Sequence, residues 1–270
     1  MIIFPNCKIN LGLNVTSKRP DGYHNLETVF YPLPLRDILE IIPAPDGLTS
    51  FRSTGLPIPG IPEQNLCVKA FRSLADEFHI PPVKIHLHKV VPMGAGLGGG
   101  SADCAFTLRL LNELFELRLD DSGMEQLASR LGSDCAFFIR NHPVFATGKG
   151  DHFEPVSIDL SAYRIVLVVP PFHVNTALAY AGISPAVPQV SVKNIENVPV
   201  EEWKKFLAND FETSVFAKFP EIGHLKEKLY ASGALYASMT GSGSAVYGLF
   251  AKDQPNKNDF SGMSVWELEL

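Results

Sequence analysis

The chain has 270 residues, of which 46% are hydrophobic and 19% are charged, a composition typical of a globular protein. Its net charge of −6, with no run of like charges, excludes a general nucleic-acid-binding protein, which would carry a basic face. No apolar run is long enough to cross a bilayer, and no basic leader followed by an apolar core opens the chain. We therefore expect a cytoplasmic protein of one large or two modest domains, without nucleic-acid or membrane partners.

The four cysteines are scattered along the chain without a C-x-x-C pair: Cys7, Cys67, Cys104 and Cys135. Neither a metal knuckle nor a disulfide framework is expected from such spacing. Each cysteine lies among apolar neighbours, so we expect buried thiols in a reducing compartment.

The first predicted element is a strand over residues 7–15, where apolar and polar side chains alternate with a period of two. Lys8, Asn10 and Asn14 share its polar face, which we expect to be only half-buried. The pattern then predicts a turn at 19–22, a strand at 28–33, loop-interrupted strands within 43–62, a helix at 65–78 and a strand at 83–88.

The second half mixes strands and helices without regular βαβ spacing, which favours the α+β class. Helices are predicted at 101–117, 122–131, 201–218 and 221–232, and strands at 164–169, 234–239, 245–250 and 264–270. Residues 252–262 are expected to form a loop. The segment 143–155 carries Gly148 and Gly150 and is the candidate domain boundary, which predicts domains over 1–155 and 156–270.

The most informative segment is residues 92–102, which contains five glycines within residues 94–100 and runs into a helical pattern. Glycine lets the backbone adopt positive φ and approach a ligand, and the following helix directs unpaired N–H groups toward an anion. The segment is not a Walker A loop, because no Gly-Lys-Ser/Thr follows. A dinucleotide site is disfavoured, since its acidic residue would fall at Glu113 or Glu116 inside a predicted helix. A phosphate is the expected ligand.

Three segments, at residues 5–11, 92–102 and 240–245, resemble the three motifs of the GHMP kinases (galactokinase, homoserine kinase, mevalonate kinase, phosphomevalonate kinase). Residues 19–24, 131–134 and 209–212 look like the 4-diphosphocytidyl-2-C-methyl-D-erythritol kinases within that superfamily. The resemblance implies an N-terminal ATP-binding domain and a C-terminal ferredoxin-like α/β sandwich. It also implies ATP-dependent phosphorylation of the substrate's 2-hydroxyl in the non-mevalonate route to isoprenoid precursors.

The resemblance assigns catalysis to Asp134 as the base and to Lys8 beside it. Asp134 precedes an apolar run, which predicts a partly desolvated site. Without the resemblance, the pattern favours a helix or turn cap for Asp134 and a solvated strand position for Lys8.

Substrate recognition is assigned by the same resemblance to an aromatic pair and its surroundings. Tyr23 would stack on the cytosine, His24 would bind its edge, and Asn10 would hydrogen-bond the substrate. Thr176 and Tyr180 fit the spacing of a second aromatic position that would cover the base. Packing roles for Tyr23 and Tyr180 stay open alternatives.

ATP binding is assigned to the glycine loop and two flanking positions. These residues are Pro92, Met93, Gly94, Ala95, Gly96, Leu97, Gly98, Gly99, Gly100, Ser101, Ala102, Asn65 and Lys89. A helix cap for Asn65 and a surface position for Lys89 are the alternatives. Mg²⁺ should bridge the ATP phosphates, with Ser101 as a candidate contact or simply a helix cap. Asp210 also matches the family, without an evident physical role beyond capping or an inter-domain contact.

The chain departs from the family pattern at Cys7, where alanine is usual, and at Gly99 and Gly100, where serines are common. These changes do not alter the predicted reaction class. They leave open which hydroxyl contacts Mg²⁺. The alternatives are a GHMP kinase acting on another small alcohol and a non-catalytic nucleotide-binding relative. We expect a small-molecule substrate carrying a cytidine diphosphate group and a monomer or weak homodimer.

Overall fold

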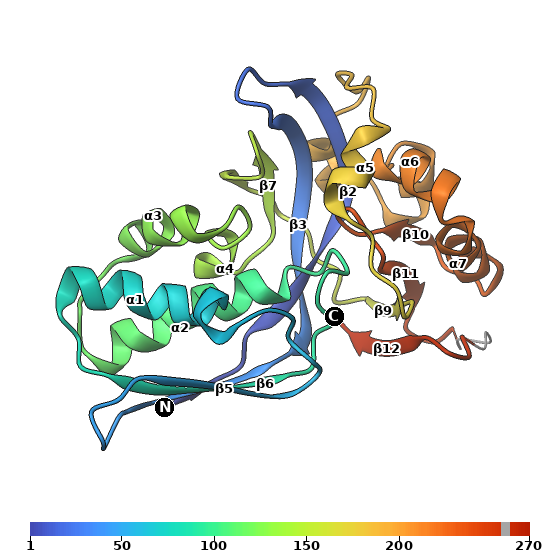
Figure 1. The fold of residues 1–270 in the computed structure, drawn as a ribbon. Coiled ribbons are helices and arrows are strands. Elements are labelled where there is room, and N and C mark those ends of the chain that lie inside the picture. Colours follow the sequence, from blue (N-terminus) through green and yellow to red (C-terminus); the bar gives the residue numbers. More distant parts are fainter. Residues whose placement is uncertain (255–259) are drawn as a thin grey trace. The chain divides into compact units, whose positions relative to one another are not determined.

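The computed structural model describes residues 1–254 and 260–270. Its chain divides into two compact units that interleave along the sequence. Unit 1 comprises Met1–Cys7, Leu35–Met93 and Gly98–His142, and unit 2 comprises Lys8–Pro34, Gly94–Leu97 and Pro143–Leu270. Helices and strands are mixed along the chain (Figure 1), which confirms the α+β class. In the described part of the chain, no helix is both long and apolar enough to span a membrane.

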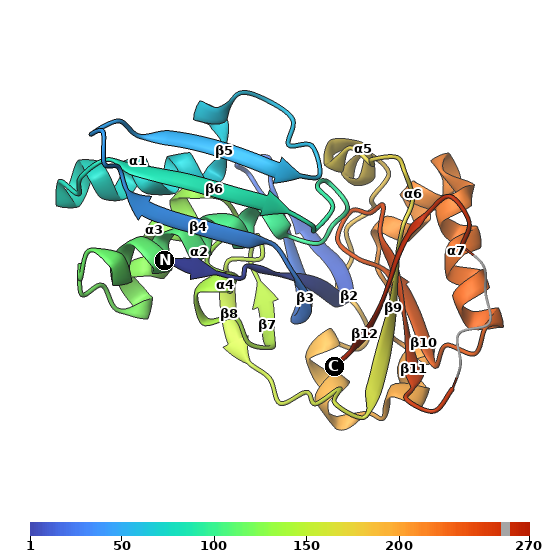
Figure 2. The ribbon, with the colours of Figure 1, turned by 90° about the horizontal axis from the view of Figure 1, so that it is seen from below.

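Unit 1 is built on a four-stranded sheet in the order β1 (Ile2–Ile3), β4 (Ile38–Pro43), β6 (Val83–Lys89) and β5 (Ser50–Gly55). Strands β5, β6 and β4 lie side by side in Figure 2. The helical elements of this unit are η1 (Pro62–Gln64), α1 (Leu66–Phe78), α2 (Gly99–Leu114), α3 (Asp121–Leu131) and α4 (Phe137–Arg140). Alternate residues of β6 are buried, as its sequence pattern predicts.

Unit 2 contains most of one sheet and all of another. The first has the order β2 (Asn6–Lys18), β3 (His24–Arg36), β7 (Val144–Thr147) and β8 (His152–Pro155). The second is antiparallel, in the order β10 (Tyr236–Met239), β11 (Val246–Ala251), β9 (Tyr163–Val169) and β12 (Ser264–Glu269). Its helical elements are α5 (Thr176–Ala181), η2 (Val192–Asn197), η3 (Val200–Lys205), α6 (Phe211–Lys218) and α7 (Pro220–Ala231).

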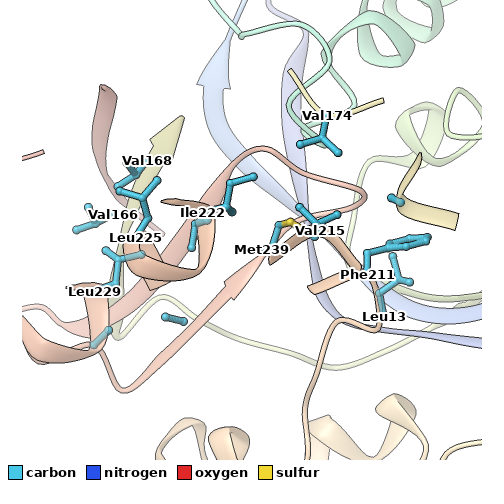
Figure 3. Close-up of a cluster of buried hydrophobic side chains, with 14 of the residues drawn as sticks. Leu13, Val166, Val168, Val174, Phe211, Val215, Ile222, Leu225, Leu229 and Met239 are labelled. Atoms are coloured by element: carbon cyan, nitrogen blue, oxygen red, sulfur yellow. The ribbon is translucent and has the colours of Figure 1, made fainter. Parts of the chain in front are cut away.

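The core of unit 2 lies between the second sheet and the helices α6 and α7 (Figure 3). Val166 and Val168 are two residues apart in β9, so both belong to the cluster that the helices cover. Ile222, Leu225 and Leu229 recur at helical spacing on α7 and are buried in the same cluster. Burying each such side chain contributes about 1.5–3 kcal/mol, which makes this cluster a main stabilising element of the unit.

The structure corrects two expectations about the secondary structure, one about the helix predicted at 201–218 and one about the polar face of β2. Residues 143–155, the candidate domain boundary, form the hairpin β7–β8, whose turn needs Gly148 (φ +67°) and Gly150 (φ +89°). Glycine is frequent in hairpin turns and at domain boundaries alike, so composition did not predict the hairpin. The predicted helix over 201–218 is interrupted between η3 and α6, where Asn209 uses its side chain to bond the carbonyls of Met239 and Gly241.

The polar face of β2 is buried rather than half-exposed: Lys8 and Asn10 are 3% and 2% exposed. The side chains of Lys8 and Asn10 are hydrogen-bonded to each other, so they can be buried without loss of hydrogen bonds. The alternation of apolar and polar residues therefore did not mean that the polar face is exposed to solvent. Three short elements, β1, α4 and α5, have too few residues for a periodic pattern and were not predicted. Of the loop expected over 252–262, residues 255–259 lie outside the described residues.

Candidate active site

The glycine-rich segment adopts the backbone that its composition predicts. Gly94, Gly96 and Gly98 have φ of +66°, +80° and +69°, and they alternate with Ala95 and Leu97, which are buried. Successive residues with such alternating conformations turn their N–H groups toward one side and form an anion-binding concavity. The segment therefore has the geometry of a phosphate-binding loop.

The helix that follows this loop begins without a side-chain cap. Gly98 is its N-cap and supplies no side chain, whereas Asn65, Asp120 and Asn175 cap α1, α3 and α5 through hydrogen bonds. The first N–H groups of α2 are thus left for another acceptor, and the positive end of the helix dipole favours an anion. Asn65 accepts from the Cys67 amide at 2.9 Å, so the cap role considered for it is realised.

The loop packs closely against residues 240–245, the segment that resembles the third motif. A Cβ on Gly96 would lie 2.0 Å from the carbonyl oxygen of Thr240, so only glycine allows this approach. The Ala245 amide donates to the Ala95 carbonyl at 3.1 Å. Two segments 144 positions apart in sequence therefore shape one loop.

Lys8 reaches the same loop from β2. Its ammonium donates to Asn10 Oδ1 at 2.8 Å and to the Gly96 carbonyl at 3.2 Å. The ammonium also lies 4.9 Å from the centre of the Phe30 ring, a cation–π distance. A buried positive charge is thus held in one place beside the expected phosphates.

Asn10 connects this lysine to a buried hydrogen-bond network. Its Nδ2 donates to Thr28 Oγ1 at 2.9 Å, and Thr28 Oγ1 donates to the Gly12 carbonyl at 2.5 Å. Its backbone N–H donates to Thr240 Oγ1 at 3.0 Å. Asn10 therefore orients Lys8, and the predicted bond from Asn10 to substrate stays a prediction.

The sequence did not reveal Thr28, because a lone threonine in a strand carries no recognisable pattern. It also left Asp210 without a role, which the structure supplies. The carboxylate accepts from the Val15 amide at 2.7 Å and from Asn14 Nδ2 at 3.2 Å. Asp210 thus fastens the segment before α6 to β2.

On the predicted substrate side, the ring of Tyr180 stacks on that of His24, with centroids 4.8 Å apart and planes 21° from parallel. Tyr180 also contacts the ring of Phe211 edge-on, with centroids 4.7 Å apart. Tyr23 is 59% exposed, so its ring has the room that a stacked base would need. Thr176 Oγ1 lies 3.1 Å from Ser242 Oγ. The structure brings His24 and Tyr180 together, and their roles toward a base stay predictions.

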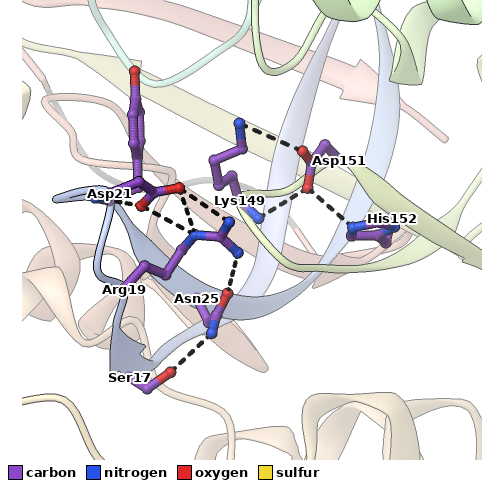
Figure 4. Close-up of polar contacts among 8 residues, drawn as sticks. Ser17, Arg19, Asp21, Asn25, Lys149, Asp151 and His152 are labelled. Atoms are coloured by element: carbon purple, nitrogen blue, oxygen red, sulfur yellow. Dashed lines mark hydrogen bonds and ion pairs between the residues drawn. The ribbon is translucent and has the colours of Figure 1, made fainter.

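The turn that presents Tyr23 is braced by polar contacts (Figure 4). Asp21 accepts from the Tyr23 amide at 3.1 Å and forms an ion pair with Arg19, whose hydrogen bond lowers the pKa of Asp21. Lys149, from the turn between β7 and β8, lies with its ammonium 5.1 Å from the centre of the Tyr23 ring. Sequence reasoning missed Lys149, because residues 143–155 were interpreted as a candidate domain boundary and not as a hairpin.

Asp134 is half-buried and lies between α3 and α4 in unit 1. Ser101, in the first turn of α2, is within hydrogen-bond reach of Cys135, the residue after Asp134. Lys8 belongs to unit 2, and its pairing with Asp134 stays a prediction.

Lys89 is 1% exposed, so the alternative of a surface lysine is wrong. Its ammonium donates to Asp37 Oδ2 at 2.5 Å and to Asp103 Oδ2 at 2.7 Å. The ammonium is therefore paired with two carboxylates. Contact between Lys89 and ATP stays a prediction.

Comparison with known proteins places this site in a family. Residues 65–143 match the GHMP kinases N terminal domain, and residues 192–263 match the GHMP kinases C terminal domain. A curated 4-diphosphocytidyl-2-C-methyl-D-erythritol kinase from Parabacteroides distasonis is 53% identical over 100% of both chains. That of Bacteroides fragilis is 54% identical over the same shares. The chain belongs to this family of GHMP kinases.

Solved structures agree with the assignment. The crystal structure of a 4-(cytidine 5'-diphospho)-2C-methyl-D-erythritol kinase aligns with a TM-score of 0.78 at 32% identity, covering 92% of this chain and 90% of the other. The Methanococcus jannaschii mevalonate kinase aligns with a TM-score of 0.70 at 14% identity over 100% and 98% of the two chains, which shows a shared fold. The predicted GHMP kinase fold is confirmed. The two matched domains lie on either side of residue 155, whose place as domain boundary stays a prediction.

Proposed function

We propose that this kinase transfers the γ-phosphoryl group of ATP to the 2-hydroxyl of 4-diphosphocytidyl-2-C-methyl-D-erythritol, in the non-mevalonate route to isoprenoid precursors. The observation that carries the proposal is 53% identity, over the whole length, to a curated kinase named for that substrate. We further propose a cytoplasmic enzyme that works as a monomer or weak homodimer.

Phosphoryl transfer needs positioning and charge neutralisation more than covalent chemistry from the protein. In our proposal, Asp134 accepts the proton of the 2-hydroxyl as that oxygen attacks phosphorus, and Lys8 stabilises the developing negative charge. The support for Lys8 is its buried ammonium, held by Asn10 and the Gly96 carbonyl. The support for Asp134 is its half-buried position after Gly132-Ser133, where the family places its base.

We propose that residues 92–102 bind the ATP phosphates. The positive φ angles of the loop and the uncapped N-terminus of α2 support this role. Across residues 1–254 and 260–270, no three His, Cys, Asp or Glu side chains are grouped to hold a metal ion. Without such a group, these residues are not expected to hold a metal ion by themselves. We propose that Mg²⁺ binds through the ATP phosphates, with the Ser101 hydroxyl as the candidate protein ligand.

The cytosine of the substrate is assigned to the aromatic group of unit 2. Tyr23 offers an exposed ring, and the His24–Tyr180 pair lies in the same unit as Lys8. Aromatic faces suit a planar base, and the His24 backbone and ring supply hydrogen-bonding groups for its edge. Thr176, one turn before Tyr180 on α5, is assigned to the same side.

The test is ADP release from Mg-ATP with 4-diphosphocytidyl-2-C-methyl-D-erythritol, homoserine and mevalonate offered in parallel. We expect turnover with the cytidyl compound alone. Turnover with homoserine or mevalonate instead would keep the kinase and reject the substrate. ATP binding without turnover of any of the three would contradict the proposed reaction.

A further inference from the structure

A buried ion triad in unit 1 takes no part in the proton transfer and charge stabilisation proposed above for Asp134 and Lys8. The ammonium of Lys89 lies between Asp37 and Asp103, with side-chain exposures of 0%, 0% and 5%. Removing three charged groups from water is unfavourable, and well-packed apolar residues often stabilise a core as well or better. Stability alone is therefore a weak explanation for the triad.

The triad is bonded to the chain on both sides of the phosphate-binding loop. Asp37 Oδ1 accepts from the amides of Val90 and Val91, at 2.6 and 2.8 Å, directly before Pro92. Asp103 belongs to α2, which begins where the loop ends. One ammonium thus joins the entry and the exit of the loop.

The start of α2 also lies directly against this ammonium. A Cβ on Gly99 would be 3.0 Å from Lys89 Nζ and 2.8 Å from Val91 Cγ1. Contacts this short would require the side chains of Val91 and Lys89 to move, which favours glycine at position 99. The first turn of α2, whose N–H groups are left open, is thus located by Lys89 and the residues that hold it.

We propose that Lys89, Asp37 and Asp103 are positioning residues that hold the phosphate-binding loop in its ATP-binding shape. The proposal rests on the loop's assigned role in the proposed function. A loop fixed at both ends gives up less freedom when it closes on a triphosphate, so its affinity is higher. Asp103 Oδ1 is buried without a hydrogen-bond partner among the described residues. An unpaired buried acceptor lowers the stability of the folded protein, so stability alone does not account for this carboxylate.

The test replaces the three ionisable side chains by uncharged ones in the variant Asp37→Asn/Lys89→Met/Asp103→Leu. The amide oxygen introduced at position 37 can still accept from the amides of Val90 and Val91. Because no charge remains buried, we expect the variant to fold. We expect the Kd and KM for ATP to rise about 10- to 100-fold, as for displaced binding groups, while KM for the acceptor changes less than about threefold.

The control is Lys84→Met on the same strand, where the lysine pairs with the exposed Asp46 at 2.7 Å. That variant should keep the parental affinities for both substrates. A triple variant that is folded and binds ATP as the parent does would overturn the proposal. So would an equal loss of affinity for ATP and acceptor, because that pattern indicates a general structural defect.

Should the triple variant not fold, Asp103→Asn decides, since it keeps the shape and removes the ionisable carboxyl group. A rise of about threefold or more in the Kd for ATP, with an unchanged acceptor KM, supports the positioning role, and an unchanged Kd rejects it. Direct titration with ATP needs no acceptor. The triad is therefore tested even if the chain phosphorylates a different alcohol, and the two failures can be told apart.

Discussion

The network behind Lys8 can be tested by the substitution Thr28→Val, which keeps the side-chain shape and removes one hydroxyl. Thr28 is 0% exposed, and its hydroxyl accepts from Asn10 Nδ2 at 2.9 Å. Without it, a buried amide hydrogen of Asn10 has lost its partner. Since Asn10 Oδ1 accepts from Lys8, rotation of the amide to recover a bond would disturb the lysine.

The expected size of the effect follows from these contacts. A buried donor left without a partner lowers the free energy of unfolding by about 1–3 kcal/mol. For a chain of this length, that corresponds to a fall in Tm of about 2–4 °C per kcal/mol. If the displaced Lys8 loses about 1.4 kcal/mol of transition-state stabilisation, kcat falls about tenfold.

The assays are thermal unfolding and steady-state ADP release with both substrates varied. A matched control is Thr107→Val, because Thr107 is also 0% exposed and its hydroxyl donates to the Asp103 carbonyl at 2.7 Å. That carbonyl lies in the helix α2, remote in sequence from Lys8, so kcat should not change. The reasoning would be refuted if Thr28→Val lowered Tm but left kcat as in the control.

Three further outcomes are expected. Asp134→Asn should lower kcat about 100- to 10,000-fold with little change in the Kd for ATP, and an equal loss of ATP affinity would mean that the base lies elsewhere. Tyr23→Ala should raise KM for the cytidyl substrate more than KM for ATP, and a change confined to ATP would remove Tyr23 from the substrate site. Burial, reinforced by the Asp37 carboxylate and opposed by Lys89, raises the pKa of Asp103 from 3.8 to about 7. The nucleotide-free protein should therefore lose stability as the pH rises through that window, because its folded state holds a proton that the unfolded chain releases. Chemical denaturation from pH 4 to 8 should show a flatter slope for Asp103→Asn, and identical slopes would contradict the shift.

Local patterns in the sequence determined much of the fold. Periods of two and of 3.6 predicted β2, β6 and the helices α1 to α3, because these periods follow the geometry of a strand and of a helix, and a continuous apolar run predicted β9. The glycine spacing of residues 94–100 predicted a loop with positive φ and an open helix start, since these properties reside in the backbone itself. Turns were harder: residues 143–155 carry glycines that fit a domain boundary and a hairpin equally well.

The partners of the predicted site residues were decided by tertiary structure. Asn10 and Thr240 are bonded across 230 positions of sequence, and Lys89 and Asp37 across 52. No periodicity records such pairings, because each depends on which strands the fold brings side by side. The sequence by itself thus determined the glycine-rich backbone of the loop, and it predicted the roles of Lys8 and Asp134 through a family resemblance. The tertiary structure decided that Asn10 orients Lys8 and that Lys89 is a buried cation shared by two carboxylates, since a charge is tolerated there only where the fold supplies its partners.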